Sequence, residues 1–275
     1  VIIMAWFAGG IFSGLLLTRS LLEPQPWQRF VPGMGIFLFI TRILLGLALF
    51  SFIGALWGCA GSFILVPVIA SVIACVIAGA VAGRYFGESQ LVGLARDWLY
   101  IARIWSESGT SQRFACSLLL FALCAMMINA FIGSLVPDFN HDPMWYHLPV
   151  PQQWVFDQEF FAYSSVMPSV YPLAVESIYA MMMLAGGNSV LCSLLMGWSG
   201  TFLFVLMPAA CSASLNNAAF EGRGWGVVGV SLIWVPLIAV HSYVAPLQPK
   251  NDLLGLAWGF SGAMVIWLPL LAANR

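Results

Sequence analysis

The chain has 275 residues, of which 61% are hydrophobic and only 8% are charged, and its formal net charge is −1. A soluble domain carries about 25% charged residues, so this composition excludes a water-exposed globular surface and indicates a polytopic membrane protein. A net charge this close to zero also argues against a nucleic-acid partner, which would require a basic patch.

Six cysteines lie in apolar runs and form neither a CxxC motif nor a His-paired spacing. Cysteine in such surroundings behaves as a small hydrophobic residue. We therefore expect burial, without chemistry, for all six: Cys59, Cys75, Cys116, Cys124, Cys192 and Cys211.

Long apolar runs begin at the amino terminus. Residues 1–18 form a first, short span, and a polar loop follows it. Residues 43–83 carry no charge and suffice for two spans, because one span requires about 20 apolar residues. We expect the turn between them near residues 57–62. Arg42, just before this run, is either an intramembrane functional charge or a side chain that snorkels to the interface, and we favour the interface.

Residues 84–113 are the most polar stretch, with four arginines and with apolar residues at helical spacing. This pattern predicts an amphipathic helix, which is either interfacial or an ordinary cytosolic linker. The arginines favour the cytoplasmic side. Residues 114–136 form the clearest single span, so residues 137–170 are expected to form an external loop whose aromatic side chains lie at the membrane surface.

Further apolar runs cover residues 169–185, 189–210, 225–240 and 253–273. Together with the earlier runs they make about eight spans. The expected fold is all-α, a polytopic transmembrane helical bundle with an external juxtamembrane loop. We expect a multi-pass protein of the cell (inner) membrane, in contact with membrane lipids.

A polar cluster in the external loop holds two aspartates and two histidines within ten residues of one another. Asp142 precedes Tyr146 by four residues, so a helix through this segment would place both on one face, with His147 beside them. An aspartate in this setting can act as a general base or as an oxygen ligand of a divalent metal ion. The secondary candidates are Asp138 and His141. The alternative interpretation is a capped polar loop with interfacial aromatic residues.

Two further carboxylates stand in or beside apolar runs. Glu176 lies inside such a run, where a carboxylate is expected to face a cavity or a partner. Helical spacing puts it on one face with Pro172 and Ala180. Asp252 opens the last run, where it is either a functional acidic residue or a helix N-cap.

The segment from Asp142 to Pro149 reads D-P-M-W-Y-H-L-P, and an aromatic stretch, Pro172 and Glu176 follow it. Over about forty residues this arrangement resembles polytopic glycosyltransferases of the GT-C class. The similar branch is that of dolichyl-phosphate-mannose protein mannosyltransferases and aminoarabinose lipid A transferases. Its members often carry D-x-x-x-Y-H-L-P in an external loop, an acidic residue in the next helix, and a later acidic position where Asp252 falls.

The resemblance implies inverting transfer of a sugar from a polyprenyl-phosphate-linked donor to a hydroxyl acceptor at the external membrane face. It makes Asp142 the catalytic base. It assigns substrate binding to Tyr146, His147, Glu176 and Asp252. A divalent metal ion is compatible with this chemistry, with Asp142 and Glu176 as its ligands. The identities of the sugar and the acceptor stay open.

The resemblance also divides the chain. Residues 1–113 become a transmembrane extension with a cytoplasmic amphipathic segment, and residues 114–275 a GT-C-like module that we expect to be truncated at its carboxyl end. If every apolar run after the loop crosses the membrane, Asp252 reaches the cytoplasmic side. It joins Asp142 only if one run is re-entrant, and residues 169–185 are the best candidate.

Two other functions fit the same residues. A secondary transporter or flippase-like carrier would use Arg42 and Glu176 in its transport path, as charged side chains within apolar runs. A membrane scaffold without catalysis would tolerate alanine at its charged positions. We favour the glycosyltransferase.

Overall fold

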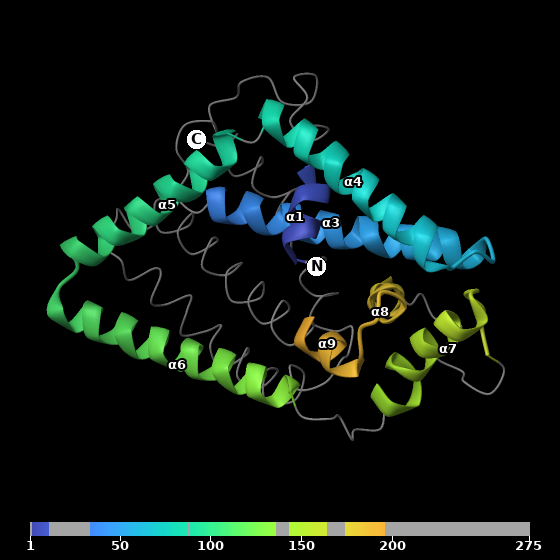
Figure 1. Ribbon diagram of the computed structural model, residues 1–275. Coiled ribbons are helices and arrows are strands. Elements are labelled where there is room, and N and C mark those ends of the chain that lie inside the picture. The colour runs from blue at the N-terminus through green and yellow to red at the C-terminus, as the bar shows by residue number, and fades with distance from the viewer. Residues whose placement is uncertain (1, 11–33, 87, 136–142, 164–173, 196–275) are drawn as a thin grey trace, which may run out of the picture.

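The computed structural model describes residues 2–10, 34–86, 88–135, 143–163 and 174–195, and these segments are helical without any strand (Figure 1). The all-α prediction is therefore confirmed for the described part of the chain. The elements are α1 (Ile2–Ala8), α3 (Met34–Cys59), α4 (Leu65–Phe86), α5 (Glu88–Glu107), α6 (Thr110–Ser134), the π-helical turn η2 (Pro143–His147), α7 (Pro149–Asp157), α8 (Ala174–Leu184) and α9 (Ser189–Leu194).

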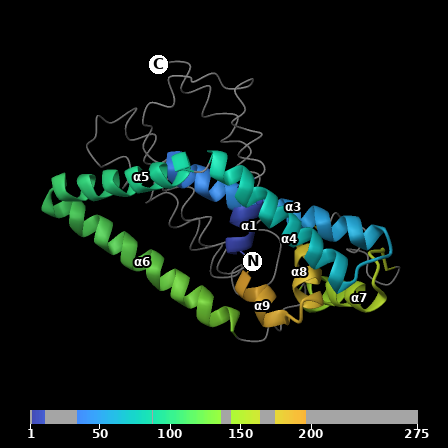
Figure 2. The same cartoon turned by 45° about the horizontal axis from the view of Figure 1, so that its top comes forward.

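Helix α3 is the element on which the others assemble. Its 26 residues give a length of about 39 Å, and α1, α5 and α8 pack against it. The side chains that it buries are mostly Ile, Leu and Phe, which exclude water from the centre of the structure. Figures 1 and 2 show α3 crossing the middle of the molecule, with α5 and α6 diverging from a shared end.

Two helices are long and apolar enough to cross a membrane, over residues 39–59 of α3 and 65–82 of α4. They occupy the run for which the sequence predicts two spans, and α3 ends and α4 begins beside the predicted turn. Only 17% of the α4 segment is buried within the chain, so most of its apolar surface faces outward. An apolar surrounding such as a bilayer is the environment that this surface favours.

The next two helices agree with the sequence in position. Helix α5 covers most of the stretch for which an amphipathic helix is predicted, and α6 covers most of the run at residues 114–136. Helix α6 exposes apolar side chains along its length: Phe114, Leu118, Phe121, Ile128, Phe131 and Ile132. Its membrane crossing, like the interfacial position of α5, stays a prediction. The expected spans at residues 225–240 and 253–273 lie outside the described residues.

The two buried charges of the amino-terminal helices each join α3 to a neighbour. Arg42 is 3% exposed, its Nε donates to the carbonyl oxygen of Trp6 at 2.7 Å, and its guanidinium lies 3.9 Å from the centre of the Trp6 ring. The expected snorkelling of Arg42 is therefore wrong, because α1 supplies both an acceptor and an aromatic face. Asp97 of α5 is 2% exposed and accepts the backbone N–H of Ile36 at 2.9 Å. This N–H belongs to the first turn of α3, where no intrahelical acceptor exists.

The cysteines depart in part from the expected burial. Cys192 is buried and Cys75 is half-buried, whereas Cys59 and Cys124 are exposed. The expectation is wrong for these two because helices that expose apolar surface also expose the small residues within it. Cys59 ends α3, at the turn into α4.

The α3–α4 turn is fastened to the segment that follows α7. The N–H of Phe160 donates to the carbonyl of Gly58 at 3.0 Å, and the N–H of Phe63 donates to the carbonyl of Gln158 at 2.9 Å. The Phe160 ring stacks on Trp154 with centroids 4.1 Å apart and lies where a Cβ on Gly58 would stand. The turn and the 143–163 segment therefore lie on the same face of the structure.

Substitution of Gly58 tests this attachment. We expect Gly58→Ala to displace the Phe160 ring and lower the free energy of unfolding by about 1–3 kcal/mol, the usual cost of overpacking. Gly109→Ala is the matched control, because a Cβ there meets nothing within 4 Å. Thermal unfolding of both variants in detergent measures the difference, and equal melting temperatures would contradict the close packing at Gly58.

Candidate functional site

Three of the predicted site residues lie in the described part of the chain, namely Tyr146, His147 and Glu176. The other four lie outside the described residues: Asp138, His141, Asp142 and Asp252. The structure therefore tests the second half of the D-x-x-x-Y-H motif and the acidic residue that follows it.

The motif's second half forms a single turn of π-helix, η2, followed directly by α7. The interpretation that Asp142 and Tyr146 share a face depends on a helix past Pro143, and helix is found from Pro143 onward, although wound more widely than an α-helix. Pro149 opens α7, a position where its missing N–H costs nothing. Isolated π-helical turns are rare and occur frequently at functional sites, because they re-aim the side chains that they carry.

His147, the last residue of η2, forms a pair with Glu176 of α8. Nδ1 of His147 lies 2.5 Å from Oε1 of Glu176, and the two residues are 1% and 0% exposed. Within the described ranges, the second carboxyl oxygen, Oε2, has no hydrogen-bond partner. The expectation that Glu176 faces a partner is confirmed, and the partner comes from the same motif, 29 residues earlier.

Helix α8 holds Glu176 in place through its neighbours. The Oγ of Ser177 lies 2.7 Å from the Ala174 carbonyl of its own helix, 3.1 Å from the Ser51 carbonyl of α3 and 3.0 Å from the Ser51 hydroxyl, so this serine contacts both helices. Ala180 is also fully buried, so the predicted common face of Glu176 and Ala180 points inward. Glu176 lies in the first turn of α8, where the helix dipole favours a negative charge.

Tyr146 covers the other side of the histidine. Its ring centroid lies 3.9 Å from that of His147, and the tyrosine packs against the cluster that contains Phe63, Val150 and Trp154. This cluster belongs to the α3–α4 turn and to α7 as well as to α8. The imidazole therefore lies between an aromatic ring and a buried carboxyl group, and the imidazole and the carboxyl group are both removed from water.

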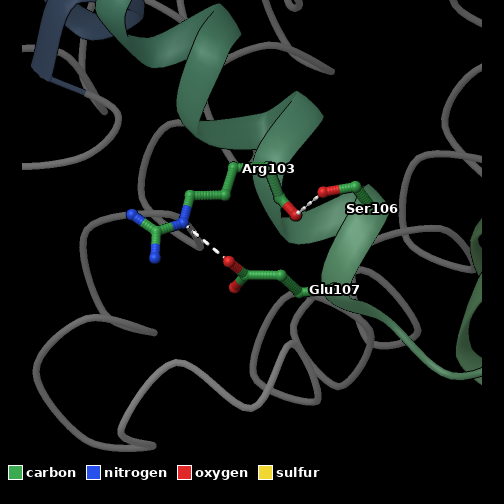
Figure 3. A network of polar contacts seen from close by, with 3 residues as sticks. All are labelled: Arg103, Ser106 and Glu107. Carbon is green, nitrogen blue, oxygen red and sulfur yellow. Dashed lines mark hydrogen bonds and ion pairs between the residues drawn. The ribbon is translucent and has the colours of Figure 1, made fainter.

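A second ion pair on α5 shows how different this setting is. Nε of Arg103 contacts Oε1 of Glu107 at 2.7 Å, with side chains that are 74% and 62% exposed, and Ser106 donates to the Arg103 carbonyl (Figure 3). An exposed pair at this spacing contributes little, because water and salt screen both charges. The His147–Glu176 contact differs from the exposed pair because both of its side chains are removed from water, so neither is screened by it.

Sequence reasoning placed His147 and Glu176 in one site but missed the bond between them. It also missed Ser177, whose contact with Ser51 spans 126 residues. The sequence feature that could have pointed to Ser177 is its position beside a glutamate within an apolar run. The metal prediction stays open: the described residues hold no group of three or more His, Cys, Asp or Glu that could bind a metal ion, and Asp142 lies outside them.

Comparisons with protein-family models, with curated proteins and with solved structures find no match to this chain. The site is therefore interpreted from its own geometry.

A double-mutant cycle measures the buried pair. Removal of one partner strands the other away from water, so Glu176→Leu and His147→Leu are each expected to lower the free energy of unfolding by about 3–5 kcal/mol. The double variant is expected to lose less than the sum, because two apolar side chains leave no unpaired polar group. The single variant Glu107→Ala serves as the control on the exposed pair and is expected to change stability little. Additive losses at His147 and Glu176 would contradict the pairing.

Proposed function

We propose that this chain is a membrane glycosyltransferase of the GT-C type, which moves a sugar from a polyprenyl-phosphate-linked donor to a hydroxyl acceptor at the external membrane face. The observation that carries the proposal is the His147–Glu176 contact. The resemblance rests on two separate pieces of sequence, the Y-H-L-P string and the acidic residue of the next helix. The contact brings these two pieces together, and a shared active site requires that they lie close to each other.

The proposed reaction begins with Asp142, which takes the proton of the acceptor hydroxyl. The acceptor oxygen forms a bond to C1 of the sugar as the bond from C1 to the phosphate oxygen breaks. The electron pair of that bond stays on the lipid phosphate, and the sugar inverts at C1. Tyr146, His147, Glu176 and Asp252 bind the substrates, and a divalent metal ion, with Asp142 and Glu176 as ligands, is the proposed cofactor.

The proposed topology is a multi-pass bundle of about eight spans in the cell (inner) membrane. In this arrangement α5 lies on the cytoplasmic side, because of the arginines around it. One membrane crossing, by α6, then lies between α5 and the 143–163 segment. One crossing, by α4, lies between α5 and the α3–α4 turn. Both the turn and the segment are thereby outside, in agreement with the hydrogen bonds that join them.

The carrier hypothesis gains nothing from the described contacts. Ser51 is the residue of α3 that contacts Ser177 of α8, the helix that carries Glu176. Arg42 lies nine residues before Ser51, a separation of about 13 Å along the axis of α3. Its guanidinium is engaged by α1. The two charges that would form the transport path are therefore apart, and we place the glycosyltransferase first.

Asparagine at position 142 tests the catalytic assignment. We expect Asp142→Asn to lower sugar transfer by about 10²–10⁴-fold, the contribution of a general base, while expression in membranes is unchanged. Incorporation of labelled sugar from polyprenyl-phosphate donors into acceptors measures it. Asp157→Asn is the matched control, since Asp157 is an exposed aspartate in the same external segment. Transfer by Asp142→Asn at the control's rate would sink the assignment.

Cysteine labelling tests the sidedness. Cys59 is exposed at the α3–α4 turn, so we expect a membrane-impermeant maleimide to label it in right-side-out vesicles but not in sealed inverted vesicles. A cysteine introduced by Ser106→Cys, on the exposed end of α5, should show the reverse pattern. Labelling at each position is measured in a chain whose other cysteines are replaced by alanine. Labelling of both sites from one side would refute the topology.

A further inference from the structure

Helix α5 exposes apolar side chains beyond its buried anchor, Asp97. Trp98 is 72% exposed and Trp105 is 44% exposed. The exposed aliphatic side chains beside them are Leu99 and Ile101. Because Asp97 is buried against α3, the helix cannot turn about its axis to cover these side chains. Contact between water and large apolar side chains is unfavourable, so this surface favours an apolar partner outside the chain.

Apolar and basic side chains lie on opposite faces of α5. Trp98 and Trp105 are seven residues apart, which is about two turns, so they lie on one face of the helix. Arg96 and Arg103 have the same spacing, and each precedes a tryptophan by two residues. Two residues correspond to about 200° of rotation, which places the arginines nearly opposite the tryptophans. Asp97 lies between the two faces and connects α5 sideways to α3. An apolar face opposite a basic face is the pattern of a helix that lies at a membrane surface.

The attachment to α3 sets the depth of α5 in a bilayer. The membrane-length segment of α3 begins at residue 39, and Asp97 is bonded to the N–H of Ile36, three residues earlier. Figures 1 and 2 show α5 at this end of α3, away from the α3–α4 turn, and extending from there to its corner with α6. In a bilayer crossed by α3, Asp97 is therefore at the edge of the apolar layer, and the residues after it are at the depth of the headgroups. Tryptophan is enriched at this depth.

The exposed charges of this region are mostly positive. Among the side chains that the structure describes on α5 and at the start of α6, three arginines and one glutamate are exposed: Arg96, Arg103, Arg113 and Glu107. Glu107 is paired with Arg103, so the other two arginines are not neutralised by it. Arg113 donates to the carbonyls of Trp105 and Ser106, at 3.1 and 2.7 Å, which holds its charge at the last turn of α5. This positive charge is complementary to the headgroups of anionic phospholipids.

We propose that α5 docks on the membrane surface and binds anionic phospholipids, with Trp98 and Trp105 among the acyl chains and the arginines among the headgroup phosphates. An interfacial helix, rather than a cytosolic linker, is thereby assigned to this stretch. The inference goes beyond sugar transfer and does not depend on it. Only the leaflet, the cytoplasmic one, follows from the proposed topology, and anionic lipids give that leaflet its negative surface potential. The bound lipids hold one end of α3 at the membrane surface through Asp97.

Spin labelling of the full chain in nanodiscs of phosphatidylglycerol and phosphatidylcholine tests the docking. A nitroxide is attached to Ala102→Cys, on the tryptophan face, or to Glu107→Cys, on the polar face, in chains whose native cysteines are replaced by alanine. Oxygen concentrates in lipid and a nickel chelate in water. We therefore expect oxygen to reach position 102 better, and the chelate to reach position 107 better. Chelate access at both positions, or access of neither reagent to position 102, overturns the proposal, because α5 then lies in water or against protein.

A charge variant tests the preference for anionic lipid. A bimane fluorophore on Ala102→Cys is quenched by phosphatidylglycerol or by phosphatidylcholine that carries a nitroxide on its acyl chain, and the ratio of the two shows which lipid is enriched at α5. We expect Arg96→Gln to lower the anionic preference about fivefold at low salt, the contribution of one arginine near a membrane surface. Glu107→Gln is the matched control, because it removes an exposed charge of opposite sign and should not lower the preference. An unchanged preference in Arg96→Gln, or an equal loss in the control, overturns the lipid assignment.

The outcome is distinguishable from that of the proposed function. If Asp142→Asn retains sugar transfer, the glycosyltransferase assignment fails, while the lipid contact at position 102 is still decided by its own measurement. If position 102 is in water, the docking of α5 fails whether or not sugar is transferred. Should Arg96→Gln not fold, the oxygen and chelate measurements on the chain with its arginines intact give the answer alone.

Discussion

A buried carboxyl group must have a partner, and that requirement fixes how the central part of this structure is connected. Glu176 stands in the first turn of an apolar helix and is completely removed from solvent. Its partner, His147, comes from the π-helical turn η2, so the chain between the two must fold back on itself. Helix α8 is in turn held on α3 through Ser177 and Ser51. The ionisable pair and the serine contact together tie the 143–163 segment, through α8, to the central helix.

The same physical rule governs the other buried charges. Arg42 joins α3 to α1 through the Trp6 carbonyl, and Asp97 joins α5 to α3 through the N–H of Ile36. Apolar surface does not select among many similar helix contacts, because in a bilayer lipid is as apolar as leucine. Hydrogen bonds from buried charges do select, since a wrong neighbour leaves a polar group unsatisfied. In a chain with so few charges, these contacts fix which helices meet.

Helices that depend on a local pattern of residues were predicted from the sequence, whereas contacts between residues far apart in the sequence were not. Uninterrupted apolar runs predicted α3 and α4, and helical spacing predicted α5, since both signals lie within one segment. Glu176 was conspicuous because a carboxylate in an apolar run is costly. Its bond to His147 was not predictable, because spacing does not reveal contacts 29 residues apart. Arg42 was misassigned to the interface for the same reason: its partner, Trp6, lies 36 residues away.

The three buried charges differ in how completely the fold explains them. Asp97 satisfies an N–H that the first turn of α3 leaves without an acceptor, and Arg42 gains a carbonyl and an aromatic face. Each has a structural role in joining helices. The His147–Glu176 pair is different, since an apolar pair of similar volume would serve stability as well or better. It also leaves Oε2 without a partner among the described residues. A polar pair that stability does not require, packed against Tyr146 and carried by a π-helical turn, is better accounted for by the proposed active site than by packing.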